Sequence, residues 1–114
     1  MTPQQFFKCL ADETRLRSLL LIQQEEELCV CELTEALDEI QPKISRHLAQ
    51  LRECKLLETR RQGQWMFYRL HRGLPDWALA ALSATLEGNA DFLAVNRARL
   101  EHMGNRPQRR AACC

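Results

Sequence analysis

The chain has 114 residues, of which 46% are hydrophobic and 27% are charged, and its net charge at neutral pH is +1. This size and composition predict one ordinary globular domain, too small to hold a second catalytic unit. No apolar run approaches the roughly 18 residues of a membrane span, and the N-terminal segment lacks the order of a secretory signal. We therefore expect no membrane partner and a cytoplasmic protein, whose six cysteines favour metal or redox chemistry over disulfides.

The charge is unevenly distributed along the chain. Residues 1 to 42 carry three basic and nine acidic side chains, a net charge of −6, whereas residues 43 to 72 carry eight basic and two acidic side chains, a net charge of +6. A basic segment is often only a solvated surface, but one that coincides with a DNA-binding motif predicts contact with a polyanion. The middle third of the chain is therefore the candidate nucleic-acid contact region.

Two scaffold helices are expected at the N-terminus. Phe6, Phe7 and Leu10 make a short apolar face. Asp12 is placed to cap a second helix, in which apolar residues from Leu16 to Ile22 recur at helical spacing. We expect these two helices to serve as scaffold.

A helix-turn-helix pattern follows. Apolar residues from Val30 to Leu37 predict a short amphipathic helix that ends near residues 38 to 41, and Pro42 suits the first position of the next helix because its missing N–H is not needed there. Ile44, Leu48 and Leu51 face inward in this second helix. The polar side chains left outward are Lys43, Ser45, Arg46, His47 and Gln50.

The second helix of such a motif places its N-terminal side chains against bases in the major groove of double-stranded DNA. Arg46 can fork onto guanine and a glutamine can read adenine, whereas Lys43 is expected to contact a phosphate. For His47, a phosphate contact or none is favoured over base reading. The helix residues predicted to contact DNA are Gln41, Lys43, Ser45, Arg46, His47 and Gln50.

A β-hairpin is predicted next. Residues 56 to 60 and 64 to 70 are rich in apolar, aromatic and β-branched side chains, and Gln62-Gly63 between them is a hairpin signal. The hairpin is typical of the wing of a winged helix, and Trp65, Phe67 and Tyr68 are expected to pack on helices. The residues predicted at its tip, against the sugar–phosphate backbone or the minor groove, are Arg60, Arg61 and Gln64.

One long helix is predicted from Pro75 to beyond Leu100. Leucines recur in it at seven-residue intervals from Leu79 to Leu100, a seam that a partner helix would bury, although Gly88 and two asparagines fall off the pattern. The sequence therefore predicts a mainly α fold with a small β-hairpin, a homodimeric winged helix-turn-helix. Residues 1–103 form the domain, and residues 104–114 form a flexible tail that ends in Cys113-Cys114.

A pair of cysteines, Cys29 and Cys31, lies shortly before the predicted recognition helix. In a regular helix, residues two apart point to nearly opposite sides, so both sulfurs can hold one ion only where a helix starts or is distorted. A helix start also favours the thiolate, which selects soft ions. The alternative is that one or both cysteines are small buried hydrophobes. Their place beside the recognition helix favours a repressor that responds to a thiophilic metal or metalloid.

The segments Glu27 to Leu33, Gln41 to Arg52 and Gly63 to Leu70 resemble the arsenic-responsive members of the ArsR/SmtB repressor family, and the resemblance extends from about Phe6 to Trp77. It implies a homodimeric winged-helix repressor of operator DNA. Such repressors leave the operator when trivalent arsenic or antimony, offered as arsenite or antimonite, binds cysteine thiolates, here Cys29 and Cys31. No enzymatic activity and no catalytic cofactor are implied.

Two departures from that family pattern matter. Thr34 stands where many relatives carry a third cysteine, so the third inducer ligand stays open between Cys113 or Cys114, Cys9, Cys54 and a small thiol from solution. Lys55 stands where relatives often have glycine. Either this lysine takes a positive φ, at a cost on the order of 1 kcal/mol, or the recognition helix ends differently.

Three other functions remain as alternatives. A thiol-oxidation switch of the same fold would use Cys54 or the Cys113-Cys114 pair. A small thiol enzyme is disfavoured because the chain lacks a Cys-x-x-Cys motif and its histidines are not grouped with a cysteine. A zinc sensor is disfavoured because the last helix offers Asp91 and Glu101-His102 at no paired ligand spacing.

Overall fold

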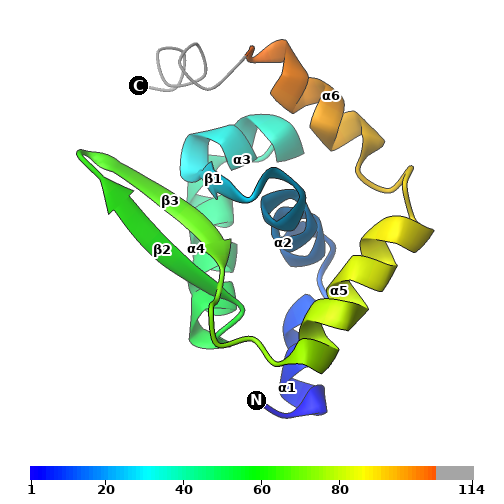
Figure 1. The fold of residues 1–114 in the computed structure, drawn as a ribbon. Helices are drawn as coiled ribbons and strands as arrows, with labels where there is room; N and C mark the ends of the chain where they lie inside the picture. Colours follow the sequence, from blue (N-terminus) through cyan, green and yellow to red (C-terminus); the bar gives the residue numbers. More distant parts are fainter. Residues whose placement is uncertain (105–114) are drawn as a thin grey trace.

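The computed structural model describes residues 1–104, so residues 105–114 of the predicted tail, with Cys113 and Cys114, lie outside the described residues. The elements in chain order are α1 (Pro3–Leu10), α2 (Glu13–Glu25), β1 (Glu27–Cys29), α3 (Val30–Leu37), α4 (Gln41–Glu53), β2 (Leu57–Gln62), β3 (Trp65–Leu70), α5 (Asp76–Gly88) and α6 (Ala94–His102). The predicted mainly helical fold is confirmed. Figure 1 shows α2 inside the ring of the other helices, with the sheet on one side.

The helix starts follow from local capping. The Thr2 hydroxyl accepts a hydrogen bond from Gln5 N at 3.2 Å, and the Gln5 side chain accepts one from Thr2 N at 3.0 Å, so two of the backbone donors at the start of α1 are satisfied. Asp12 Oδ1 accepts from Arg15 N at 3.0 Å and caps α2, as predicted. These caps set where the two scaffold helices begin.

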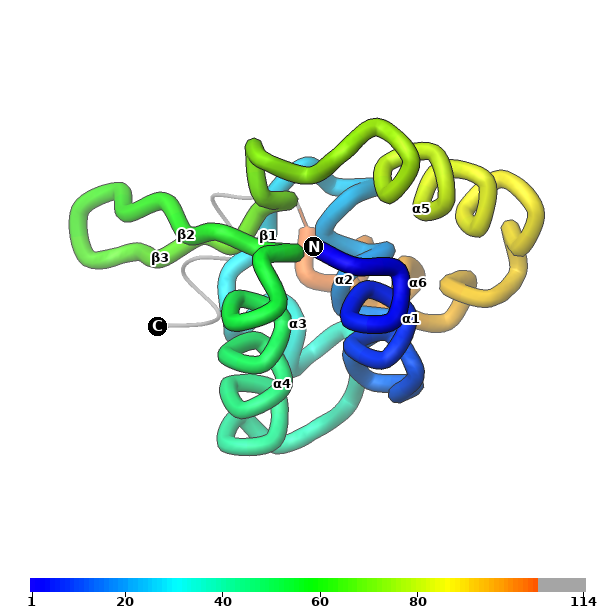
Figure 2. Tube along the Cα trace, turned by 90° about the horizontal axis from the view of Figure 1, so that it is seen from below, coloured from blue at the N-terminus to red at the C-terminus, as the bar shows by residue number. Residues whose placement is uncertain are grey.

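The sheet has three antiparallel strands in the order β1-β3-β2, where a two-stranded hairpin was predicted. The short strand β1 was missed because three residues are too few for an alternating pattern to be visible. Gln62 pairs with Trp65, so Gly63 and Gln64 form the hairpin loop, and Gly63 has the positive φ (61°) that such tight loops require. The β2–β3 hairpin projects from the helical body (Figures 1 and 2).

The helix-turn-helix is formed by α3 and α4. Asp38 ends α3 in the left-handed conformation (φ 53°), and α4 begins three residues later. Ile44, Leu48 and Leu51 of α4 are fully buried in one core with the leucines of α2. Each such side chain contributes about 1.5–3 kcal/mol through removal of apolar surface from water, so this stripe anchors the recognition helix.

The C-terminal end of α4 has the geometry of a Schellman motif. Leu56 N donates to Leu51 O at 3.0 Å, and Lys55 N donates to Arg52 O at 3.0 Å. Lys55 itself has φ 63°, so of the two alternatives drawn from the sequence, the strained lysine is the one observed. The motif turns the chain directly from the recognition helix into the wing.

The prediction of one long C-terminal helix is wrong. The chain breaks between α5 and α6, and residues 89–93 connect them. Leu93 and Leu100 are buried in the protomer's own core, so they are not free to form a seam with a partner. Asn96, which does not fit the predicted seven-residue repeat, is buried. Its Nδ2 donates a hydrogen bond to Ala36 O at 2.9 Å, and this bond joins α6 to α3.

None of the helices within residues 1–104 combines the length and the apolar character that a bilayer crossing demands.

Candidate thiol site and nucleic-acid interface

The candidate thiol site lies where β1 passes into α3. Cys29 is the last residue of β1 and the N-cap of α3, with extended backbone angles (φ −93°, ψ 168°), and Cys31 is the second residue of the helix. This change of backbone direction brings the two Sγ atoms to 4.0 Å from one another. The helix start that was predicted as the condition for convergence is therefore observed.

The electrostatics of Cys29 differ from the prediction. Burial raises the pKa of the Cys29 thiol, and the carboxylate of Glu32 raises it further, while backbone N–H groups at Glu32 and Cys31 act in the opposite direction. Glu32 is itself buried and accepts a hydrogen bond from Cys29 N at 2.9 Å. The expectation that the helix start favours a thiolate is wrong for Cys29, because desolvation outweighs the helix N-terminus.

A cavity of about 230 Å³ adjoins the two sulfurs. The cavity is bounded by the start of α3, by the first residue of α4 and by the first two residues of β3 in the wing. Thr34, which lies beside the thiols, donates its hydroxyl hydrogen to Cys31 O at 2.8 Å. The residues that line the cavity are Cys29, Val30, Cys31, Thr34, Gln41, Trp65 and Met66. A ligand held by the two sulfurs would therefore touch the wing and the recognition helix.

Within residues 1–104, no group of three side chains drawn from His, Cys, Asp and Glu lies close enough together to hold a metal ion. Cys9 and Cys54, two candidate third ligands, line a different cavity of about 250 Å³ between α1 and the end of α4. Cys113 and Cys114 lie outside the described residues. The described part of one protomer thus supplies two sulfurs to the Cys29 site.

The first turns of α4 present the predicted base-reading residues. Gln41 and Arg46 are exposed, and Ser45 is half-buried. Lys43 is also half-buried, and its Nζ lies 2.9 Å from Glu39 Oε1, an ion pair within one helical turn. The exposed residues of this face are thus Gln41 and Arg46 at the start of the helix, with Gln50 two turns later.

The expectation that His47 points outward is wrong. The residue is 7% exposed, and its Nδ1 lies 3.3 Å from Arg15 Nη1 and 3.9 Å from Asp12 Oδ1. The same Arg15 nitrogen donates to Gln50 Oε1 at 2.8 Å. Position 47 follows Ile44 by three residues, so helical spacing alone placed it on the edge of the inward stripe. Arg15 was not singled out from the sequence, and it holds two of the predicted DNA-contacting residues.

The wing separates the three predicted tip residues. Arg61 and Gln64 are exposed beside the loop, whose end lies farthest from the helices in Figure 2. Arg60 lies closer to the body and is half-buried. It pairs with Glu27 of β1 and stands over the Phe67 ring, with its guanidinium carbon 5.0 Å from the ring centroid. The tip assignment of Arg60 is therefore wrong, because cross-strand pairing draws it toward β1.

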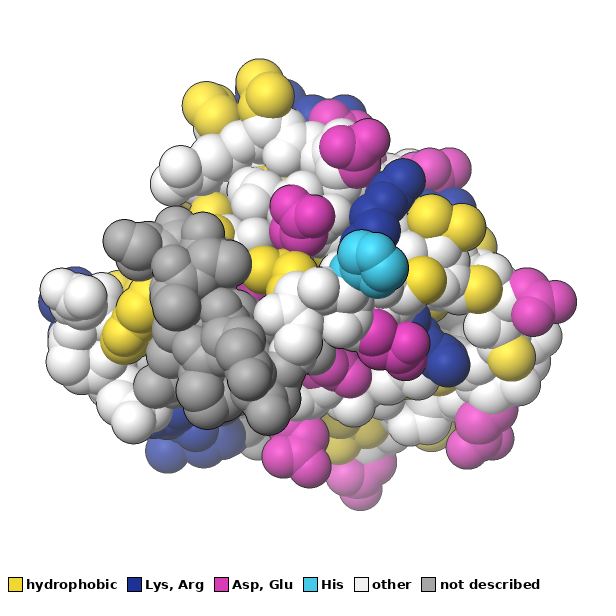
Figure 3. All heavy atoms as spheres, turned by 90° about the horizontal axis from the view of Figure 1, so that it is seen from above, with side chains coloured by type: hydrophobic (Ala, Val, Ile, Leu, Met, Phe, Trp, Pro, Cys, Tyr) yellow, Lys and Arg dark blue, Asp and Glu magenta, His cyan; other side chains and the backbone are white. Residues whose placement is uncertain are grey.

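Much of the positive charge of residues 43 to 72 is neutralised within the chain. Lys43 pairs with Glu39 and Arg60 with Glu27, while Glu58 lies between Arg69 and Arg72 at 3.3 and 3.2 Å. Arg46 and Arg61 form no ion pair within residues 1–104. On the α6 side of the molecule, acidic and basic side chains are interspersed where described atoms are visible (Figure 3). The cations of this segment that remain for a polyanion thus lie on α4, in the turn that ends it, where Lys55 is exposed, and at the wing tip.

A short helix, a polar-faced second helix with a buried inner stripe, and a projecting hairpin define a winged helix-turn-helix transcriptional regulator. Residues 12–59 match the model of the arsR family of bacterial regulatory proteins. The chain is 56% identical over 113 residues to the arsenic resistance transcriptional regulator ArsR1 of Pseudomonas putida, covering 99% of this chain and 88% of that one. The chain belongs to the arsR family.

Solved structures agree with this assignment. HlyU from Vibrio cholerae N16961 is similar over 76% of this chain and 90% of its own, with a TM-score of 0.67 and 31% identity. The AntR antimony-specific transcriptional repressor is similar over 75% of each chain, with a TM-score of 0.61 and 29% identity. The matching proteins are transcriptional regulators, which confirms the prediction of a regulator and not an enzyme.

Proposed function

We propose that the protein is a homodimeric repressor of operator DNA in the cytoplasm, released when arsenite or antimonite binds Cys29 and Cys31. The observation that carries this proposal is the shared cavity. The two sulfurs, 4.0 Å apart, line the same space as Gln41 of the recognition helix and Trp65 and Met66 of the wing. The names of the relatives, an arsenic resistance regulator and an antimony-specific repressor, support this choice of inducer.

The chemistry of the inducer suits a cysteine pair with one buried member, Cys29. Arsenous acid and two thiols exchange two As–OH bonds for two As–S bonds and release two water molecules, so the exchange adds no charge to the cavity. That exchange is compatible with the raised pKa of Cys29. The third arsenic position would keep its hydroxyl or take a further thiol, for which Cys113, Cys114 and a small thiol from solution are the candidates.

Two connections lead from the thiols to the DNA-contacting elements. Cys29 is the cross-strand partner of Phe67, which in turn pairs with Arg60 of the wing. On the other side, α3 packs directly against α4, whose first residue lines the cavity. A coupling of about 1–3 kcal/mol between the two sites changes operator affinity roughly 5- to 150-fold, so a small displacement of either element is sufficient.

The dimer would form through the outer faces of α1 and α5. Phe7, Trp77 and Leu79 are 59%, 41% and 37% exposed, an unusual share of surface for such side chains. The Phe6 ring contacts those of Phe7 and Trp77, with centroids 5.0 and 5.1 Å apart, so the two helices present one apolar surface. A two-fold axis there would set two recognition helices in successive major grooves about 34 Å apart.

The proposed roles at the DNA follow from exposure and pairing. Arg46 and Gln41 would read base edges, and Lys43 would leave Glu39 for a phosphate. Ser45, Gln50, Arg61 and Gln64 would contact the backbone, with the last two at the wing tip. His47 and Arg60 would position the helix and the wing through Arg15 and Glu27.

A release titration tests this function. A fluorescent operator duplex bound to the protein is titrated with arsenite, antimonite, zinc and peroxide. We expect Cys29→Ser and Cys31→Ser to bind the duplex but to ignore both metalloids, and Cys54→Ser, which changes a thiol outside the cavity, to release normally.

Full release of both cavity variants by metalloids would reject the inducer site. Release of the unaltered protein by peroxide alone would replace the proposal with a thiol-oxidation switch. The same titration on a chain lacking residues 104–114 shows whether the tail supplies the third ligand.

A further inference from the structure

A second pair of thiols lies at the junction of α1 with the end of the recognition helix. Cys9, on the inner face of α1, is 5% exposed, and Cys54, the C-cap of α4, is half-buried. Both are free thiols. Cys9 Sγ lies 3.8 Å from Gln50 O, and Cys54 N donates to the same carbonyl oxygen at 3.0 Å. One backbone carbonyl thus places both residues.

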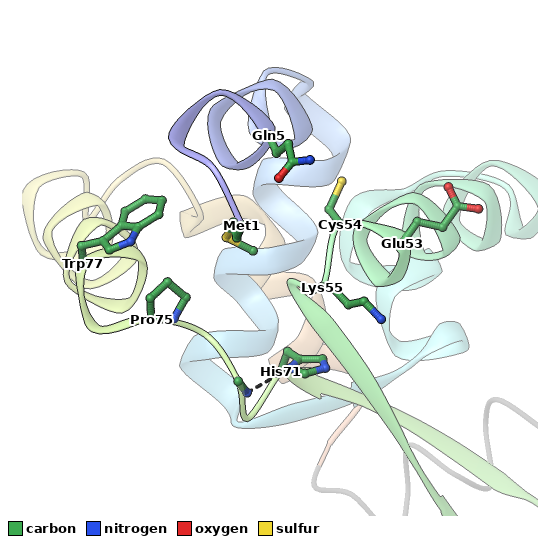
Figure 4. Close-up of a pocket in the computed structure, with 9 residues that line it drawn as sticks. Met1, Gln5, Glu53, Cys54, Lys55, His71, Pro75 and Trp77 are labelled. Carbon is green, nitrogen blue, oxygen red and sulfur yellow. Dashed lines mark hydrogen bonds between the residues drawn. The ribbon is translucent and has the colours of Figure 1, made fainter.

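The two sulfurs face one space. Both residues line the cavity of about 250 Å³ at this junction. The close-up in Figure 4 shows the Cys54 sulfur directed toward α1, while the Glu53 and Lys55 side chains point away. Cys54 also borders a larger cavity of about 610 Å³, which extends to Trp77 and Pro75. A ligand that bridges the sulfurs therefore has room for a substituent.

The rim of the smaller cavity is polar. It is formed by Gln5, Lys8, Gln50 and Glu53, and all four are exposed. The apolar surface proposed for dimerisation includes Phe7, which lies between Gln5 and Lys8 in sequence but outside this rim. The cavity can therefore be entered from solvent without passing through that apolar surface.

We propose that Cys9 and Cys54 form a second site, which captures a trivalent arsenical bearing one organic substituent and two exchangeable oxygens. Two thiols complete the coordination of such a compound, whereas an inorganic metalloid would keep a hydroxyl. The site is separate from the Cys29–Cys31 cavity, and it needs neither those residues nor the C-terminal tail.

The capture step is balanced without an oxidant or reductant. Each S–H bond breaks as an As–S bond forms, each As–OH bond breaks, and the two hydroxyls leave as water with the two thiol protons. Burial raises the pKa of Cys9 to about 12, and interaction with the Cys54 sulfur adds to this effect. A thiol held neutral in this way disfavours a divalent cation, which needs thiolates, but not an exchange that leaves every species neutral.

The test uses the full-length chain with Cys29, Cys31, Cys113 and Cys114 changed to serine, so that only Cys9 and Cys54 remain of the six cysteines. Phenylarsine oxide is the probe, and native mass spectrometry is the readout. In water the oxide is hydrated to phenylarsonous acid, PhAs(OH)2, and we expect one phenylarsenic group per chain, formed with loss of two waters from this acid. The adduct should survive excess glutathione and be removed by dithiothreitol.

The matched controls are Cys9→Ser and Cys54→Ser in the same background, with circular dichroism to show that each folds. Because the second As–S bond forms within one molecule, losing either thiol should weaken binding by roughly 100-fold or more. A folded four-serine chain without an adduct, or equal binding by the single-thiol variants, would overturn the proposal.

A second measurement avoids the multiple variant. In the unaltered protein, phenylarsine oxide should protect both Cys9 and Cys54 from alkylation by N-ethylmaleimide. If Cys9 or Cys54 were alkylated as fast with phenylarsine oxide as without it, the proposal of this site would also be overturned. Neither experiment depends on operator release, so a failed inducer site and a failed second site are distinguishable.

Discussion

The Glu27 carboxylate on β1 and the Arg60 guanidinium on β2 form an ion pair across the intervening strand β3, with Arg60 Nε 3.0 Å from Glu27 Oε2. Glu27 lies two residues before Cys29, and Arg60 stands over Phe67, the cross-strand partner of Cys29. The strand that carries the first thiol is thereby fastened to the wing. A ligand that displaces β1 will therefore move the wing as well.

Replacing Glu27 tests this fastening. Glu27→Gln keeps the side-chain shape but removes the charge, and we expect arsenite to bind as before while its effect on operator affinity falls roughly 2- to 5-fold. This estimate assumes that a partly exposed ion pair contributes up to about 1 kcal/mol to the coupling free energy. Operator affinity is measured with and without saturating arsenite. Glu58→Gln, which removes the partner of Arg69 and Arg72 within the hairpin, is the control, and equal coupling loss in both variants would contradict the prediction.

Arg46 and Arg61 should differ in what they contribute to DNA binding. Arg46→Ala should cost about 1–3 kcal/mol on the cognate duplex and relax selectivity at one base pair, because the lost contact is to a base. Arg61→Ala should weaken binding to every duplex and lower the slope of log affinity against log salt by about one, because the lost contact is to a phosphate. Titrations on cognate and scrambled duplexes at several salt concentrations measure both. A uniform loss for Arg46→Ala would assign it to the backbone instead.

The pH dependence of release should distinguish a metalloid from a divalent cation. Burial raises the pKa of Cys29 above the ordinary value of a cysteine thiol, so this thiol stays protonated between about pH 6 and pH 8. A divalent cation must displace the proton, and its affinity should rise about tenfold per pH unit for each thiol proton released. Arsenous acid releases water, so its release midpoint should stay within about twofold over that range. Titrations of the labelled complex with arsenite and cadmium check this, and an arsenite midpoint that follows the cadmium slope would show that Cys29 reacts as a thiolate.

Lys55→Gly should stabilise the protein. Lys55 has φ 63° in the motif that ends α4, a conformation that costs a side-chain-bearing residue about 1 kcal/mol more than glycine. The free energy of unfolding should rise by about 0.5–1 kcal/mol, the remainder being lost to the greater freedom of glycine in the unfolded chain. Urea denaturation at one fixed protein concentration measures it. Lys55→Ala, which removes the charge but keeps the strain, should leave stability within about 0.5 kcal/mol of the parent, and a gain as large as that of glycine would contradict the explanation.

Phe7→Glu should dissociate the proposed dimer. Phe7 is 59% exposed in the described protomer, and two copies of it would lose about 3 kcal/mol of apolar burial, which raises the dissociation constant roughly 100-fold. Analytical ultracentrifugation over a range of concentrations measures this. Val95→Glu on α6 is the matched control, since Val95 is 61% exposed and is not part of the proposed α1–α5 surface. If Val95→Glu dissociated the dimer and Phe7→Glu did not, the dimer interface would be assigned to α6 instead of α1 and α5.

The sequence by itself determined the elements whose signals are local. Asp12 before an apolar helix, Gly63 between two apolar runs and Ile44, Leu48 and Leu51 at helical spacing each act through neighbouring residues, so the scaffold helices, wing and recognition helix were all predicted. The closeness of Cys29 and Cys31 was also within reach, because it depends on where one helix starts.

Only the tertiary structure decided features that join residues far apart in the chain. Strand β1 exists because Glu27 to Cys29 pair with residues 67 to 69, and Arg60 leaves the wing tip because Glu27 is brought beside it. His47 lies at the edge of the inward stripe by helical spacing, and its contact with Arg15 is a tertiary addition. The predicted long helix breaks where Leu93 and Leu100 pack into the protomer's own core. The meeting of Cys9 with Cys54 is likewise tertiary, since a long-range contact leaves no periodic trace in either segment.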